Sequence, residues 1–502
     1  MSQAVQAKPK PREGILSNPD FVKLWVGESI SLIGSQVTQF ALPLVAVLTL
    51  RSTVFQVGVL NALRFVPVIV ISVFAGVWLD RRRRRPVLIA SALSSAVIIG
   101  LVPLASALGV LSFGLLCAVA TLAGALTVVS DVGALSYVPF LVERRHLAES
   151  NSKLQASFAV AGISGPGLAG LLIGLITAPI TLSVDAVSYL FAALGLILIS
   201  KPEPEPDAAA DRPSIRRSIA EGFHAVYGTR LLRVLLAQSA TLNVGFGAVS
   251  TVFTVYAIRT LHLSPAKLGI TVAGLAVGAL FGALLANRIR HALGLGRCMA
   301  VSIVGVSASP VALLLPRSAG LVATAVLFAG WLGHGAGISV WNVNTITLRQ
   351  ALTPMRLLAR MNATYRMLLF GALPAGALAG GLLGNALGLR TALVISVIVL
   401  TTPILWIFFS PVFRLVDMPL GPLSAASPDD ADAATPAAGA AGSPGEAGGS
   451  PGEAAGPRSE TGAPQAEEAG PQAEEAGPQG EEAGSGPART TAVLQRMDKA
   501  DD

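Results

Sequence analysis

Glu28, Arg64, Asp131, Asp185 and His334 are ionisable side chains that lie inside segments apolar and long enough to cross a membrane. A charged group at such a depth is costly, so each is a functional candidate by default. A carboxylate there must be paired, hydrated or protonated, which makes proton transfer the chemistry open to these residues. We predict that Asp185, Glu28 and Arg64 take part in proton coupling, with Asp185 first because it has no obvious structural partner.

These residues also have structural explanations. Asp185 can instead make a fixed hydrogen bond between helices, and the Glu28 side chain can extend toward the membrane surface. His334 fits a hydrogen-bonded packing residue better than a proton carrier. No acidic residue falls within the later apolar segments, from residue 231 onward, so proton coupling is expected to use the first half of the chain.

The sequence contains no set of residues typical of an enzyme. A Gly-rich phosphate loop of the type G-x-x-x-x-G-K-[ST] is absent, which argues against ATP as an energy source. The two cysteines, Cys117 and Cys298, lie in or beside apolar segments and suggest neither a disulfide nor a metal site. We therefore predict a protein that is not an enzyme, with no catalytic residues, no metal and no cofactor.

The elements that must position the buried charges are membrane-spanning helices. Hydrophobic residues make up 52 % of the chain and charged residues 13 %, whereas about a quarter of a soluble domain is charged. Spanning helices need about 20 mostly apolar residues, and continuous rather than alternating runs exclude a barrel. Twelve such runs are present: Leu24–Leu48, Val57–Leu79, Val87–Leu108, Ser112–Leu135, Leu154–Ile176, Ile180–Ile199, Leu231–Ile258, Leu268–Ala286, Met299–Leu315, Leu321–Val343, Ala363–Ala386 and Thr391–Ser410.

Lysine and arginine predict the orientation of these helices. With the N-terminus in the cytoplasm, 26 Lys and Arg residues fall on the inner side and 5 on the outer side. Arg349, Arg360 and Arg366 are counted on the inner side. Cytoplasmic loops carry an excess of these residues, so both termini are predicted to be cytoplasmic in a multi-pass protein of the plasma membrane.

The chain divides into two six-helix bundles that resemble each other at an offset of 211 residues. Gly58 matches Gly269 and Asn151 matches Asn362. Related halves are common in secondary transporters, which hold the substrate between them. The predicted organisation is a cytoplasmic N-terminus over residues 1–23, bundles over 24–199 and 231–413, a cytoplasmic linker loop over 200–230, and a tail over 414–502.

The tail differs from the rest in composition and charge. Residues 1–420 carry a net charge of +18, whereas residues 421–502 carry −11 and are rich in Ala, Gly, Pro and Glu. Such a composition cannot bury a core, so we predict a disordered acidic segment. The positive charge of the apolar part is expected from cytoplasmic loops and does not indicate nucleic-acid binding.

The loop after the second apolar run, GVWLDRRRRRP over residues 76–86, places an acid among arginines. A carboxylate at Asp80 can lie at the positive N-terminus of a neighbouring helix. Arg84 is placed to pair with Asp131 at the inner end of the fourth helix, and together these contacts would hold the two halves together on the cytoplasmic side. The alternative is that the five arginines only fix the topology.

This loop resembles the major facilitator superfamily, whose motif is G-x-L-A-D-R-x-G-R-R. The matching residues are Gly76, Asp80, Arg81, Arg84 and Arg85, and the sequence departs from the motif at Trp78, Leu79 and Arg83. In the fifth helix, Gly165, Pro166 and Gly170 resemble the antiporter signature G-P-x-x-G-G, although ordinary packing of small residues explains them equally well. Other stretches over about residues 17–413 are similar to the branch that includes macrolide and siderophore exporters.

The resemblance implies an all-α membrane fold and an activity. It implies proton-driven export of a hydrophobic or amphipathic small molecule by a monomer in a prokaryotic plasma membrane, with uptake symport or lipid flipping as alternatives. The expected partners are the substrate, protons and the lipid bilayer. Polar residues on helices one, seven and ten would line the central cavity or bond between helices: Gln36, Gln39, Asn243, His334, Asn342 and Asn344.

Overall fold

The computed structural model describes residues 14–79, 82–203 and 215–408. The predicted tail over 414–502, most of the N-terminus, Asp80 and Arg81 lie outside these ranges. Every long element of the described residues is a helix, and twelve helices or helix pairs are long and apolar enough to span a membrane, as predicted.

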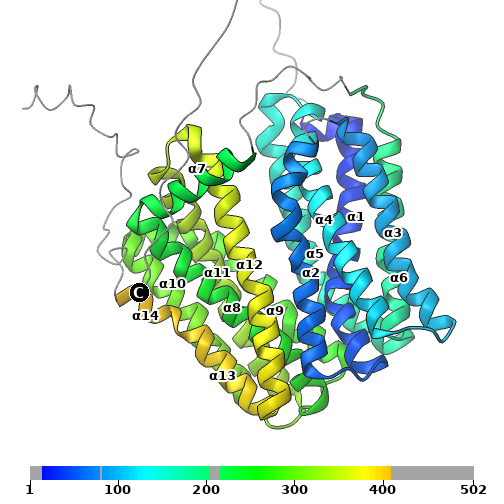
Figure 1. The fold of residues 1–502 in the computed structure, drawn as a ribbon, viewed down its shortest axis with the longest axis vertical. Helices are drawn as coiled ribbons and strands as arrows, with labels where there is room; N and C mark the ends of the chain where they lie inside the picture. Colours follow the sequence, from blue (N-terminus) through cyan, green and yellow to red (C-terminus); the bar gives the residue numbers. More distant parts are fainter. Residues whose placement is uncertain (1–13, 80–81, 204–214, 409–502) are drawn as a thin grey trace, which may run out of the picture. The chain divides into compact units, whose positions relative to one another are not determined.

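The twelve spans form two sets of six within residues 14–408 (Figure 1). The first set consists of α1 (Pro19–Leu44), α2 (Val54–Leu79), α3 (Arg84–Ala107), α4 (Phe113–Leu141), α5 (Leu147–Ile176) and α6 (Ala178–Ile197). The second consists of α8 (Arg230–Arg259), α9 (Pro265–Leu293), α10 (Leu295–Ala308) with η4 (Ser309–Leu314), α11 (Leu321–Leu352), α12 (Met355–Leu387), and α13 (Leu389–Thr401) with α14 (Pro403–Phe408). We call the end at which α1 and α12 begin the linker end, and the other the opposite end.

The backbone conformation of the two halves is similar at positions 211 residues apart, the offset found in the sequence. Helices α2 and α9 begin at Val54 and Pro265, one offset apart. Positive φ angles, which residues other than glycine seldom adopt, occur at Arg51 and again at His262. Both residues lie in turns at the opposite end, before α2 and α9. The two halves therefore share local conformation as well as sequence.

The linker between the halves contains a helix where the sequence analysis predicted a polar loop. Helix α7 (Ile215–Gly228) packs against α12 and α8 (Figure 1). Val226 on α7 is fully buried beside Met361 and Tyr365 of α12. The apolar residues at 219, 223 and 226 follow the spacing of an amphipathic helix, which the polar composition of the segment conceals.

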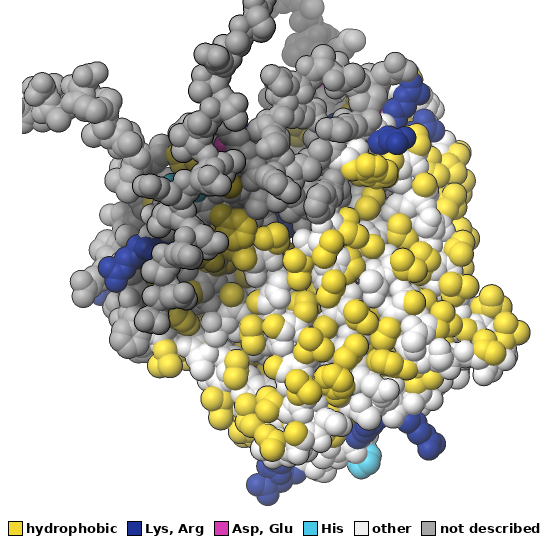
Figure 2. Space-filling view, viewed as in Figure 1, with side chains coloured by type: hydrophobic (Ala, Val, Ile, Leu, Met, Phe, Trp, Pro, Cys, Tyr) yellow, Lys and Arg dark blue, Asp and Glu magenta, His cyan; other side chains and the backbone are white. Residues whose placement is uncertain are grey.

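The surface suits a lipid environment. Large hydrophobic side chains are exposed along the spans, including Val97, Phe281 and Leu284. Where Figure 2 shows described residues, hydrophobic side chains are spread over the face, with Lys and Arg toward its edges. Because helices satisfy their own backbone hydrogen bonds, such a surface can face hydrocarbon.

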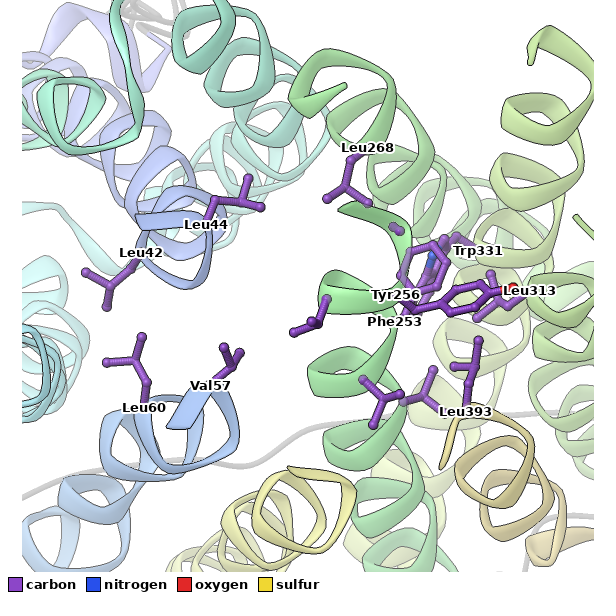
Figure 3. Packing of buried hydrophobic residues seen from close by; sticks show 14 of the residues in the cluster. Leu42, Leu44, Val57, Leu60, Phe253, Tyr256, Leu268, Leu313, Trp331 and Leu393 are labelled. Atoms are coloured by element: carbon purple, nitrogen blue, oxygen red, sulfur yellow. The ribbon is translucent and has the colours of Figure 1, made fainter. Parts of the chain in front are cut away.

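The buried core is continuous between the halves near the opposite end. Leu44 and Val57 of the first half belong to the same cluster as Phe253 and Leu268 of the second (Figure 3). Arg259 at the end of α8 also donates to the Ser52 carbonyl across the halves, at 2.6 Å. Toward the linker end, α2 and α12 diverge (Figure 1).

Candidate functional site: a charged cavity between the two halves

A cavity of about 570 Å³ lies on the linker side of the contacts between the halves. All six helices of the first half contribute to its lining, α3 and α5 by one residue each, and α12 lines it from the second half. The charged residues in its wall are Glu28, Arg64, Asp131, Asp185 and Arg366. All four membrane charges predicted for the first half therefore meet in one space.

Asp185 occupies the most enclosed position in this wall. Its side chain is only 1 % exposed, and the Ser188 hydroxyl donates to Oδ1 at 3.1 Å. A Cβ built on Gly34 of α1 would lie 2.7 Å from the same Oδ1, so the α1 backbone packs directly against the carboxylate. Beside it, the hydroxyls of Ser35 and Tyr189 are 3.1 Å apart. The glycine is what permits α1 and α6 to meet around an acid.

Arg64 is the cation on this side of the cavity. It is half-buried on α2, and its Cζ lies 5.5 Å from the centre of the Phe65 ring. No ion pair joins Arg64 to Asp185, although the structure describes both and they interact electrostatically. The Asp185 carboxylate is therefore held by hydroxyl and backbone contacts, with a guanidinium near it but not bound to it.

A second group of charges lies nearer the linker end. Asp131 on α4 and Arg366 on α12 are both exposed, so the cavity is open to solvent around them. Glu28 on α1 lines the same part of the cavity and is half-buried. Asp131 interacts electrostatically with both Arg366 and Glu28. The charges of the two halves thus face each other across an open space.

Arg366 is the functional candidate that the sequence analysis placed wrongly. It was counted among the cytoplasmic residues, although it lies three residues inside the eleventh apolar run, which begins at Ala363. Helix α12 begins at Met355, so Arg366 lies eleven residues into it, about 16 Å along its axis. The chain already contains the signal, since Arg366 falls inside the predicted span.

The predicted polar cavity residues divide into two groups. Gln36 and Gln39 line the cavity. The side chains of Asn243 and Asn344 donate to carbonyls of their own helices, both at 2.8 Å, and the exposed Asn342 lies outside the lining.

His334 lies outside the cavity lining as well and fits the packing explanation. Its Nδ1 is 2.8 Å from the Val306 carbonyl, and its ring stacks on Phe246 at 5.6 Å. The side chain is only 3 % exposed. Among the described residues, the polar contact of the ring is therefore with the protein interior.

The arginine loop makes contacts different from those predicted. No hydrogen bond or ion pair joins Arg84 and Asp131, both of which the structure describes, because Asp131 lies ten residues from the end of α4, well inside the cavity. The backbone N–H groups of Arg84 and Arg85 donate instead to Glu203, at 2.7 and 2.9 Å. Gly76 lies in α2, and the predicted contact of Asp80 falls outside the described residues.

Glu203 was missed by the sequence analysis. As a carboxylate at the N-terminus of α3, it accepts two otherwise free N–H groups in the favourable direction of the helix dipole. The Arg85 guanidinium donates to the Leu196 and Ile197 carbonyls at the end of α6, both at 2.9 Å.

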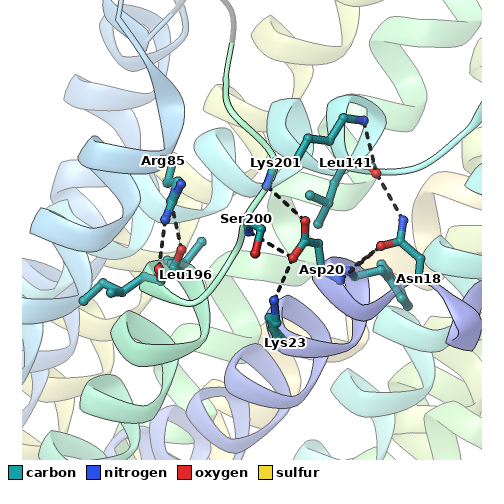
Figure 4. Close-up of polar contacts among 10 residues, drawn as sticks. Asn18, Asp20, Lys23, Arg85, Leu141, Leu196, Ser200 and Lys201 are labelled. Carbon is teal, nitrogen blue, oxygen red and sulfur yellow. Dashed lines mark hydrogen bonds and ion pairs between the residues drawn. The ribbon is translucent and has the colours of Figure 1, made fainter.

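The start of the linker is held to the first half in the same way. Asp20 accepts from the backbone of Ser200 and Lys201 (Figure 4). Residues 200–203 are therefore fixed to the first half, whereas α7 is fixed to the second.

The Gly165, Pro166 and Gly170 motif brings α5 close to its neighbours. A Cβ on Gly165 would overlap Gln36 of α1, and one on Gly170 would overlap the Pro265 carbonyl of α9. The reciprocal contact joins Gly269 of α9 to the Pro166 carbonyl. The two contacts between α5 and α9 lie toward the opposite end and join the halves there, which supports the packing explanation.

Comparison with known proteins places these features in a family. The family model described as Major Facilitator Superfamily matches residues 24–372. The chain is 26 % identical over 366 residues to the multidrug efflux pump Tap of Mycolicibacterium fortuitum, which covers 70 % of this chain and 86 % of Tap. It is 24 % identical over 361 residues to the enterobactin exporter EntS of Salmonella typhimurium, which covers 70 % of this chain and 82 % of EntS.

Solved structures share the fold at lower identity. The nucleoside transporter NupG (D323A mutant) aligns with a TM-score of 0.67 and 11 % identity, over 78 % of this chain and 99 % of NupG. A bacterial homologue of the iron transporter ferroportin in an inward-facing state aligns with a TM-score of 0.64 and 15 % identity, over 79 % of this chain and 99 % of that chain.

Proposed function

The chain belongs to the Major Facilitator Superfamily and is a multi-pass membrane transporter. We propose that it exports hydrophobic or amphipathic small molecules in exchange for protons. The observation that carries the proposal is the cavity between the halves, where three carboxylates and two arginines share a wall with aromatic side chains. The transport direction is supported by two relatives whose names describe efflux or export, Tap and EntS.

The chemistry of the cavity wall supports the proposal of proton exchange. Glu28, Asp131 and Asp185 can each take up a proton, and Phe65, Phe158 and Phe370 offer apolar surface to the same space. A substrate with an apolar body and a polar or cationic group is suited to such a wall. Protons and such a substrate would compete for the carboxylates, which is the requirement for exchange rather than cotransport.

Alternating access would expose this cavity to the two sides in turn. In the structure the halves touch at the opposite end and the charged cavity lies toward the linker end. With the linker end in the cytoplasm, as the Lys and Arg distribution predicts, this conformation would receive substrate from inside the cell. We place the protein in the plasma membrane of a prokaryote as a monomer, with both termini cytoplasmic. Asp80 and Arg84 remain proposed gating residues at the linker end.

The test is an accumulation screen in cells that carry the full-length protein or an empty vector. A panel of lipophilic cations, neutral amphipathic drugs and catechol compounds is added, and cell-associated compound is measured with and without a protonophore. Export predicts lower accumulation of at least one compound with the protein, and loss of the difference with the protonophore. Higher accumulation with the protein would indicate uptake and contradict the proposal.

A further inference from the structure

The charges of the cavity are distributed unevenly between the halves. The first half supplies Glu28, Asp131 and Asp185, together with Arg64. Among the described residues that line the cavity, Arg366 is the charged residue from the second half.

Comparison of equivalent positions in the two halves shows where this difference in charge arises. At the offset of 211 residues, the three acids correspond to the neutral residues Ser239, Asn342 and Ser396. The position equivalent to Arg366 in the first half is the neutral Gln155. The two related bundles thus carry opposite charge where they face each other.

Arg366 faces the acids without binding them in this conformation. It lies on α12, opposite Asp131 on α4 and Glu28 on α1, and no ion pair joins these three described residues. Asp131 and Arg366 are both exposed in this conformation. The other ionisable groups in the cavity wall are Arg64, Asp185 and Tyr189.

We propose that Arg366 is the counter-charge that closes the linker end by pairing with Asp131 and Glu28 when the two halves approach. Closure shortens the distance and expels water, and both changes strengthen an arginine–carboxylate pair. Protonation of the carboxylates removes the charge that Arg366 binds and favours the open linker end. The pair is therefore a coupling element between proton load and conformation.

The proposed function gives this element its place in transport, on which the inference rests. A closed linker end with ionised acids accepts protons from the other side of the membrane. Proton binding breaks the pair and lets the linker end open, as in the structure. Proton release then leaves the carboxylates free for a substrate cation or for Arg366. Arg366 would act through the acids and is a positioning residue.

The test measures the conformational equilibrium of the full-length protein in lipid nanodiscs. Ser152 of α5 and Ala292 of α9 are exposed and lie near the linker end of opposite halves. Both are replaced by cysteine after Cys117→Ser and Cys298→Ser, and spin labels report the distance between them at pH 8 and pH 5. The variants are Arg366→Gln, Arg366→Lys, Asp131→Asn and the charge exchange Arg366→Asp with Asp131→Arg.

The matched control is Arg360→Gln. Arg360 lies on the same helix but pairs with Glu221 of α7, outside the cavity lining. Arg360 carries the same charge as Arg366 and lies on the same helix, but it does not line the cavity with Asp131 and Glu28.

We expect a short-distance population in the unsubstituted protein at pH 8 that falls at pH 5. Arg366→Gln and Asp131→Asn should each lower the ratio of closed to open protein at pH 8 roughly tenfold. Arg366→Lys should retain most of the closed population at pH 8, and the charge exchange should restore it. Arg360→Gln should leave the ratio of closed to open protein unchanged. Size-exclusion profiles establish that each variant is folded.

The proposal is overturned if folded Arg366→Gln behaves like Arg360→Gln, or if no closed population responds to pH in the unsubstituted protein. This readout needs no substrate, so it separates the inference from the proposed function. A protein that exports no compound can still have a closed population that depends on pH and on Arg366. An active exporter can lack this dependence.

Discussion

Gly170 offers a direct test of how the two halves are sealed at the opposite end. It lies on α5 of the first half against Pro265 and Ala266 at the start of α9 in the second. A Cβ at this position would lie 2.9 Å from the Ala266 Cα and overlap the Pro265 carbonyl. These contacts are with backbone atoms, which cannot rotate away.

The expected effect of Gly170→Val follows from this contact. Inserting extra methyl groups into a packed contact costs about 1–3 kcal/mol. The strain exists only while the halves touch at the opposite end. The equilibrium should therefore shift toward the conformation in which they separate there, by about 5- to 150-fold.

Distances between spin labels measure this shift. Val110 and Leu321 are 65 % and 84 % exposed and lie near the opposite end of different halves, so each can be replaced by a labelled cysteine. Gly170→Val should increase the population with the longer distance. Gly174→Val is the matched control, one turn farther along α5 with no atom within 4 Å of its Cβ position. If folded Gly170→Val and Gly174→Val gave equal distance distributions, the contact at Gly170 would not hold the halves together at the opposite end.

Further substitutions test proton coupling, the contacts of Glu203 and the orientation in the membrane. Asp185→Asn should lose transport driven by a pH gradient but keep substrate binding and exchange, measured in vesicles, because asparagine keeps a hydrogen-bonding group but cannot carry a proton; full gradient-driven transport would remove Asp185 from the mechanism. Glu203→Gln should lower the free energy of unfolding by about 1 kcal/mol, because the N–H groups of Arg84 and Arg85 lose a charged acceptor; an unchanged melting temperature would argue against this cap. A cysteine at Ser2 should resist a membrane-impermeant thiol reagent in intact cells, and labelling from outside would contradict the predicted orientation.

The sequence was sufficient to predict the number of spans and the repeat, because both depend on strong apolar runs and their spacing. Helix boundaries were less accurate. Helices α5 and α12 begin at Leu147 and Met355, seven and eight residues before the predicted apolar runs. Their first turns are polar, so hydropathy alone does not detect them.

The site was predicted in part. Glu28, Arg64, Asp131 and Asp185 stand out as charges in apolar segments, and the structure gathers them around one cavity. Arg366 did not stand out, because an arginine near the edge of an apolar run has the same pattern as one in a cytoplasmic loop. Its position depends on where α12 begins, and α12 packs there against α7 and α8.

The partner of Arg84 could not be predicted from depth alone. Asp131 and Arg84 were assigned similar depths from their distance to the ends of apolar runs. The structure continues α4 to Leu141, which places Asp131 about 15 Å from the end of the helix. Glu203, in a Pro-rich segment expected to be only a connection, takes the backbone contacts instead.

Exchange of substrate for protons can be measured as proton flux in liposomes. The purified full-length protein is reconstituted with a pH-sensitive dye inside, and a compound identified in the accumulation screen is added to one side. We expect protons to move opposite to the compound, and Asp185→Asn to abolish this proton movement. Protons moving in the same direction as the compound, or transport without any proton movement, would contradict the proposed exchange.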